Sequence, residues 1–197
     1  MQRKRLLLAG LSIVFILVLL SGCAGAPKPS AANFKNPTVA LNHVEIPYYV
    51  GYYYFANSVA PTQGKAGDYG APLQLAFIYD IHNPNQYPVQ LNSFRFTVMF
   101  EDFEVNTVSS PEIMWVPAGK TNQLRVPAMF DTRQTLLTLL LPGAMQLKEK
   151  GVTPWQLLEK WWVGAPDFSF DVSAAQGAAV FSAAPITRVV AFDATFP

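Results

Sequence analysis

The sequence predicts a mainly β protein, an antiparallel β-sandwich with a helical insertion before the last strands. Several short segments alternate apolar and polar residues with the period of two that is typical of a half-buried strand. Clusters of Pro, Asn and Gly separate these segments, as turns between antiparallel strands require. Helical signals are confined to 131–164, so helices and strands do not alternate as they do in an α/β sheet.

The first predicted strand covers 38–46. Pro47 is expected to end it, because proline cannot donate a hydrogen bond to a neighbouring strand. The aromatic segment 48–55 comes next, and its residues leave open whether it forms a strand or a loop. A polar stretch containing several glycines then separates this segment from the next periodic one.

The clearest strand pattern lies at 73–82, where Leu, Phe, Tyr and Ile alternate with mostly polar residues. Turn residues follow at 83–88, where Asn tolerates unusual backbone angles and Pro has a fixed φ. A strand of alternating aromatic residues follows at 89–101, so the turn is predicted to join the two strands as a hairpin. Shorter strands are predicted at 103–108 and 122–126.

Helical signals begin at Asp131, which has a glutamine three residues later, as in a capping box, and precedes the leucine-rich run 136–141. Pro142-Gly143 interrupts that helix, and a second piece follows. Thr153-Pro154 predicts the start of another helix, and Gly164 predicts its end. Alternating residues then predict the closing strands, in the segments 168–172, 179–182 and 188–196.

The N-terminal segment 1–22 has the parts of a secretory signal peptide. Three basic residues are followed by an uncharged, largely apolar run from Leu6 to Leu20, and small residues precede Cys23, the only cysteine of the chain. The alternative is an uncleaved transmembrane helix, but the run is shorter than the roughly 20 residues that span a bilayer. The sequence therefore predicts a segment that is removed from the mature protein.

Leu20-Ser21-Gly22-Cys23 resembles the lipobox of bacterial lipoproteins. The resemblance implies cleavage before Cys23, lipidation of its sulfur, and attachment of the mature protein to a membrane through this lipid anchor. It also implies residence at the periplasmic face of the bacterial cell envelope, and Ala24 in place of a retaining aspartate favours the outer membrane. Residues 23–36 are then a lipidated flexible tether, and 37–197 form a single domain.

The segment 81–91, which contains Asn83-Pro84-Asn85 and leads into a strand of alternating phenylalanines, resembles a known family. The family is the group 2 late embryogenesis abundant proteins and their bacterial relatives with a Water stress and Hypersensitive response (WHy) domain. The resemblance implies an immunoglobulin-like or fibronectin-like sandwich, a role in stress or desiccation protection, and no enzymatic activity. It also implies that Asn83, Pro84 and Asn85 form a structural turn. Longer segments at 48–70 and 136–163 depart from the family's pattern.

Charge and cysteine content exclude several classes of partner. Without the three basic residues of the signal peptide, the chain has 11 basic and 13 acidic side chains and no basic cluster in its sequence. A nucleic-acid partner is therefore not expected, since such partners need clustered positive charge. With one cysteine, the chain can form neither an internal disulfide nor a thiolate metal site.

Two histidines are the candidate catalytic or metal-ligating groups. His43 stands two residues before Glu45, and His82 stands two residues after Asp80, so each pair could share one face of a strand. The rival interpretation, that all four are polar positions on a half-solvated face, is favoured. Motifs of serine hydrolases, phosphate-binding loops and zinc proteases are missing from the sequence. We therefore expect no enzyme, no catalytic residue, no metal, and no cofactor besides the covalent lipid on Cys23.

Aromatic residues are the candidates for binding a partner. Tyr52, Tyr53 and Tyr54 could form an adhesive loop, or they could pack in the core and at a strand edge. Trp161 and Trp162 are adjacent in a predicted helix, so the sequence predicts that one of them faces the core and the other is exposed.

These observations predict a noncatalytic, membrane-anchored envelope lipoprotein with a binding or protective role. One alternative is an assembly or trafficking adaptor that grips an envelope protein partner. Another alternative is a carrier that holds an apolar ligand between the layers of the sandwich.

Overall fold

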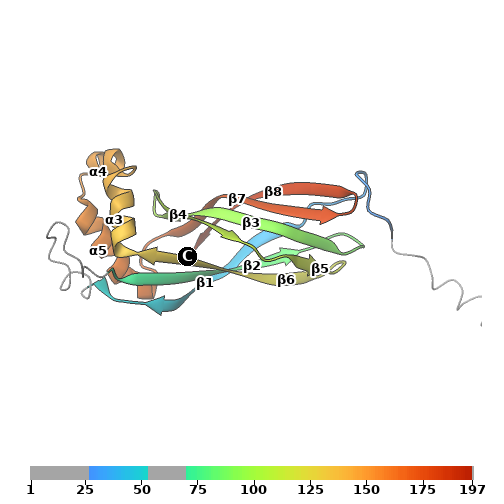
Figure 1. The fold of residues 1–197 in the computed structure, drawn as a ribbon, viewed down its shortest axis with the longest axis horizontal. Helices are drawn as coiled ribbons and strands as arrows, with labels where there is room; N and C mark the ends of the chain where they lie inside the picture. The colour runs from blue at the N-terminus through green and yellow to red at the C-terminus, as the bar shows by residue number, and fades with distance from the viewer. Residues whose placement is uncertain (1–26, 53–69, 197) are drawn as a thin grey trace, which may run out of the picture.

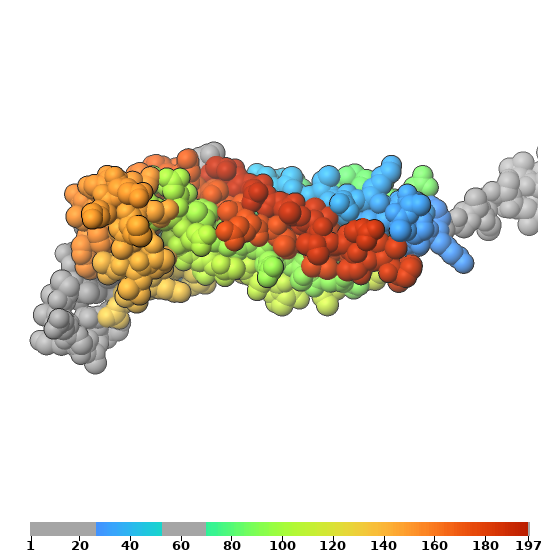
Figure 2. Space-filling model, turned by 90° about the horizontal axis from the view of Figure 1, so that it is seen from above, coloured from blue at the N-terminus to red at the C-terminus, as the bar shows by residue number. Residues whose placement is uncertain are grey.

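The computed structural model describes residues 27–52 and 70–196, which form two antiparallel sheets packed face to face. The predicted β-sandwich is therefore confirmed. Helices close one end of the sandwich, and the first described residues lie at the opposite end (Figure 1). A view from above shows the C-terminal strands along one face between these two ends (Figure 2).

The smaller sheet has three strands in the order β1-β2-β6. Their bounds are β1 Thr38–Tyr49, β2 Pro72–His82 and β6 Thr121–Asp131. Pro47 does not end β1 as predicted, because β1 is an edge strand and Pro47 lies in an irregular stretch between Glu45 and Tyr48. Proline is tolerated at such positions, where its nitrogen is not needed for a ladder bond.

The larger sheet has the order β4-β3-β7-β8, and a short strand, β5, pairs with the beginning of β3. The bounds are β3 Val89–Phe100, β4 Phe103–Ser110, β5 Met114–Val116, β7 Val172–Ala183 and β8 Ile186–Phe196. The sequence predicted strands at 168–172 and 179–182, but of the first only Val172 belongs to a strand, the beginning of β7. The structure has one strand with a bulge at Gln176-Gly177, where Gln176 has a φ of 55° and the alternation is interrupted.

The segment Asn83–Pro88 is not a hairpin, so that prediction is wrong. It carries the chain from β2 in the smaller sheet to β3 in the larger one. Alternation shows that each strand buries one face, but two strands that pair in one sheet have the same pattern as two strands that face each other across a core. The turn residues themselves are compatible with both connections.

The helices begin where the sequence predicts. They are α3 Thr132–Leu140, α4 Ala144–Lys150 and α5 Pro154–Gly164, followed by a 3₁₀ turn, η2, Ala165–Asp167. The Asp131 side chain accepts a hydrogen bond from the Arg133 amide at 2.9 Å, which caps α3. Thr153 and Gln156 form a capping box at the start of α5. We call residues 132–167 the helical cap.

Aromatic rings fill the space between the sheets. Phe77 of β2 contacts Phe96 of β3, and Tyr79 of β2 contacts Phe94 and Phe96 of β3 and Phe192 of β8, with ring centroids 4.8 to 5.5 Å apart. The rings of Phe94, Phe96 and Phe192 also contact one another, at 4.7 to 6.3 Å. Most of these pairs are edge-on or tilted, the arrangements that aromatic quadrupoles favour.

Asn83 ties the crossover turn to the connection between β5 and β6. Its side-chain amide donates to the carbonyl oxygens of Tyr87, Val116 and Pro117 at 2.8, 3.0 and 3.2 Å. Its side-chain oxygen accepts from the backbone amide of Asn85 at 3.0 Å. Asn83 is fully buried, so these bonds satisfy polar groups that water does not reach.

Asn85 joins the same turn to the chain before β1. Its side chain accepts from the Lys35 amide and donates to the Lys35 carbonyl, both at 2.8 Å, much as a neighbouring strand would. The Tyr87 hydroxyl donates to Asn33 at 2.9 Å. Residues 33–35 therefore lie on the domain, and the predicted tether, 23–36, extends too far into the chain. Composition alone does not reveal these bonds, because they depend on a turn 50 residues away.

The Tyr79 hydroxyl is a buried polar group without a hydrogen-bond partner among the described residues. Burial raises the pKa of Tyr79 above its ordinary value. We expect Tyr79→Phe to raise the free energy of unfolding by about 1 kcal/mol, because the folded state no longer desolvates a hydroxyl. Urea unfolding measures this. Tyr49→Phe is the control and should lower stability, since the Tyr49 hydroxyl donates to the Trp162 carbonyl at 2.6 Å.

Tyr79→Phe should also change how the free energy of unfolding depends on pH in alkaline solution. The raised pKa means that the folded state keeps the Tyr79 proton after the unfolded chain has lost it, so stability declines as the pH rises above about 10. Tyr79→Phe removes this contribution, and its advantage over the wild type should grow above that pH. A loss of stability in Tyr79→Phe at neutral pH would show that the hydroxyl has a partner after all.

A second prediction concerns Asn83. Asn83→Asp keeps the shape of the side chain but removes the amide donor, so a carboxylate oxygen faces three carbonyl oxygens. We expect a decrease of at least about 3 kcal/mol in the free energy of unfolding, because each unpaired buried group costs about 1–3 kcal/mol. Asn122→Asp is the matched control: its amide makes one exposed bond, to Trp115, and should cost less than about 1 kcal/mol. Equal losses in both variants would contradict the structural importance of Asn83.

Candidate interaction surface

The predicted site residues fall into three groups. Cys23, Tyr53 and Tyr54 lie outside the described residues. Asn83, Pro84 and Asn85 form the turn described above. Tyr52, Trp161 and Trp162 are buried, so the structure does not present them on the surface.

Trp161 faces the larger sheet. Its ring packs against Phe100, Phe103 and Phe170 with centroids 5.4 to 6.3 Å apart. Its indole nitrogen donates to a carboxylate oxygen of Glu101 at 3.3 Å.

Trp162 lies at the end of the smaller sheet. Its indole nitrogen donates to the Ala71 carbonyl at 3.0 Å, and its own carbonyl accepts from the Tyr49 hydroxyl. The prediction that one of the two tryptophans is exposed is therefore wrong. Adjacent helical residues point about 100° apart, and both are buried because α5 spans the open end of the sandwich and contacts both layers.

Four of the exposed apolar residues of the cap lie on α3, directly after it and at the start of α4, whereas Val152, Trp155 and Val163 are exposed on or next to α5. Leu140 and the C-cap residue Leu141 follow Leu137 by three and four residues, and all three are exposed, whereas Leu139 is buried. Leu141 is 73% exposed, and Met145 is 77% exposed. We call Leu137, Leu140, Leu141 and Met145 the cap apolar surface. The leucine-rich run was the signal for it in the sequence, since five leucines within 136–141 cannot all face one core.

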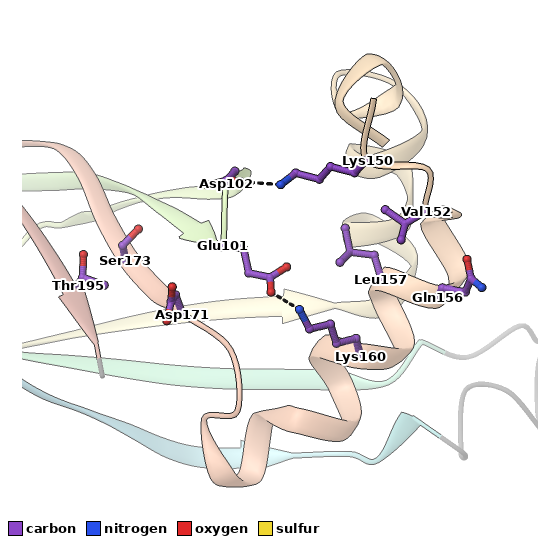
Figure 3. Close-up of a pocket in the computed structure, with 10 residues that line it drawn as sticks. All are labelled: Glu101, Asp102, Lys150, Val152, Gln156, Leu157, Lys160, Asp171, Ser173 and Thr195. Carbon is purple, nitrogen blue, oxygen red and sulfur yellow. Dashed lines mark hydrogen bonds and ion pairs between the residues drawn. The ribbon is translucent and has the colours of Figure 1, made fainter. Parts of the chain in front are cut away.

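A cleft of about 710 Å³, lined mostly by polar and charged residues, lies between the cap and the end of the larger sheet (Figure 3). Lys150 forms an ion pair with Asp102 at 2.7 Å, and Lys160 forms one with Glu101. Asp102 raises the pKa of Lys150 above its ordinary value through this hydrogen bond. Such exposed pairs contribute little stability individually, about 0–1 kcal/mol, but both link the cap to the turn between β3 and β4.

Glu101 is the central residue of this cleft. It has a φ of 53°, in the left-handed region, and its backbone amide donates to the Asp171 carbonyl at 2.8 Å. Its carboxylate is shared between Lys160 and the Trp161 indole. The carboxylates of Glu101 and Asp102 are thus engaged with the cap, and the residues that line the cleft include no histidine.

The two histidines lie on the smaller sheet. The Nε2 of His43 lies 3.5 Å from Glu45, so the structure brings this predicted pair together. Glu45 also pairs with Arg125 at 3.1 Å, and Arg125 holds the pKa of Glu45 below its usual value. His82 contacts the Thr121 hydroxyl at 3.1 Å.

Within 27–52 and 70–196, no three His, Cys, Asp or Glu residues are grouped so that they could hold a metal ion. In the same part of the chain, no helix has both the length and the hydropathy needed to cross a bilayer.

Comparisons with known proteins identify neither a family nor a function for this chain. No family model matches the chain, and no curated protein matches it. Among solved structures, a protein from Archaeoglobus fulgidus aligns with a TM-score of 0.42 and 11% identity, covering 80% of this chain and 94% of that one. A likeness this low transfers neither a fold nor a function.

Proposed function

We propose that the protein is a noncatalytic lipoprotein of the bacterial envelope, with a WHy-type sandwich domain, that acts as an adaptor by binding a protein partner through its helical cap. Lipid on Cys23 would hold it at the periplasmic face of a membrane, and it would need no other cofactor. The observation that carries this proposal is the cap apolar surface, which lies at the end of the domain opposite the first described residues (Figure 1).

The geometry directs the cap away from the proposed anchor. Pro27 lies four residues after Cys23, and an extended chain covers at most about 3.6 Å per residue, so the end of the domain near Pro27 would lie within about 14 Å of the lipid. The long strands have 11 or 12 residues and span about 35–40 Å. The cap apolar surface would therefore be presented to the aqueous side, within reach of a soluble or membrane-bound partner.

Exposed leucines favour binding over general protection. A protectant needs only a soluble surface, whereas neighbouring exposed apolar residues are typical of an interaction site. The protective role follows from the family resemblance alone.

The interior disfavours the carrier alternative. The rings of Phe77, Tyr79, Phe94, Phe96 and Phe192 contact one another in the space between the sheets that an apolar ligand would need. We therefore do not propose a ligand-carrying role.

The lipid anchor is tested by Cys23→Ser in the full chain. The wild type should fractionate with membranes and carry acyl chains by mass spectrometry, whereas the variant should lose the lipid and N-terminal processing. Ser109→Ala, an exposed substitution in β4, is the control and should behave like the wild type. A Cys23→Ser protein that is still processed at the same bond and remains acylated would refute the anchor.

The binding surface is tested by site-specific photo-crosslinking in cells. A photoreactive residue in place of Met145 should give an adduct of one defined mass, and Leu137→Ser/Leu141→Ser should abolish it without lowering the melting temperature. The matched control is the same photoreactive residue in place of Ile113, which is 63% exposed at the other end of the domain. Adducts that are identical at both positions, or that survive the double substitution, would contradict a specific partner site on the cap.

A further inference from the structure

Four segments meet at the end of the sandwich opposite the cap. The pairing of strands places them there, because Thr38 and Thr121 both pair with His82, while Met114 and Phe181 both pair with Leu91. We call these segments the N-terminal pole, which consists of residues 27–38, 82–91, 113–121 and 182–188 (Figure 1).

The N-terminal pole is basic. Its charged side chains are Lys28, Lys35, Lys120 and Arg188, all exposed, and the exposed Glu112 directly precedes its third segment. No carboxylate within the described ranges forms an ion pair with any of the four. The other described residues carry six basic and twelve acidic side chains, so charge is strongly separated along the molecule.

An exposed tryptophan lies at the same end. Trp115 of β5 is 55% exposed, and Ile113 beside it is also exposed. Trp115 is held in place through its carbonyl, which accepts from the Asn122 side chain at 2.8 Å. Tryptophan is favoured at the interface of a bilayer, where its ring reaches apolar carbons and its N–H stays near polar groups.

The chain connection brings this pole to the membrane. Pro27 is four residues after Cys23, and Asn85 fastens Lys35 to the turn at 83–88. Basic side chains are attracted to anionic lipid headgroups over about a Debye length, roughly 8 Å in physiological salt. A lipid on Cys23 would keep the pole close to that distance.

We propose that the N-terminal pole is a second membrane contact, which binds anionic phospholipid headgroups through Lys28, Lys35, Lys120 and Arg188 and places Trp115 at the interface. This inference rests on the lipid anchor of the proposed function. It adds that the domain stands upright on the bilayer, with the acidic remainder of the surface directed away from the lipid.

The test uses the full mature acylated protein in vesicles that carry brominated acyl chains, which quench nearby tryptophans. Vesicles of equal parts phosphatidylglycerol and phosphatidylcholine should quench part of the emission. Trp115→Phe should lose that quenching. Trp155→Phe should retain it, since Trp155 is 41% exposed but belongs to the cap. Quenching that survives in Trp115→Phe would overturn the proposed contact.

Charge substitutions test the headgroup contact separately. A variant without the four positive charges, Lys28→Gln/Lys35→Gln/Lys120→Gln/Arg188→Gln, should show equal quenching in these vesicles and in vesicles of phosphatidylcholine alone. Removing four positive charges elsewhere, with Arg95→Gln/Arg125→Gln/Arg133→Gln/Lys148→Gln, should leave the difference in quenching between the two kinds of vesicle unchanged. The same loss in both variants would overturn a specific basic pole.

Mass spectrometry and sedimentation separate failure of this inference from failure of the anchor. Protein that is acylated and sediments with vesicles, but shows no quenching of Trp115, keeps its anchor and lacks the second contact. Protein without lipid that sediments with neither kind of vesicle refutes both proposals. Protein without lipid whose Trp115 is still quenched by phosphatidylglycerol vesicles supports the basic pole and refutes the anchor.

Discussion

Closure of one open end of the sandwich by α5 is the constraint on which the position of the cap depends. Trp161 reaches the larger sheet while Trp162 reaches the smaller one, so the helix cannot turn without exposing one of these two tryptophans. Because α3 packs against α5, the outward face of α3 is set by the same contacts. The cap apolar surface therefore has a defined place in the fold.

The class of fold and the starts of the helices could be predicted, because they depend on local signals. Alternation marks a strand with one buried face, and Asp131 and Thr153 accept hydrogen bonds from amides only two or three residues away. Which of the two sheets a strand joins does not depend on local signals. The turn at 83–88 could not be assigned, since its residues suit both a hairpin and a crossover. The prediction that Trp161 or Trp162 is exposed was wrong for a related reason. It assumed that the helix has one buried face, whereas α5 has two.

The two candidate surfaces also depend partly on features visible in the sequence and partly on the fold. The leucine-rich run was visible in the sequence, but which leucines face outward depends on how α3 packs. The basic pole was invisible, because Lys28, Lys35, Lys120 and Arg188 are separated by up to 160 residues and only the topology brings them to one end. Charge patterning along a chain detects clusters within one segment, whereas this cluster is made by strand register.

The long strands of both sheets run along the long axis of the molecule, from one end to the other (Figure 1). The domain is therefore a spacer whose length is the length of its strands, and longer loops at either end would leave that length unchanged. Adding one residue to a strand would turn the following side chains to the wrong face unless a bulge such as the one in β7 absorbed it. The reach of such a spacer can change only in steps of two residues, about 7 Å at a time, made in both sheets together.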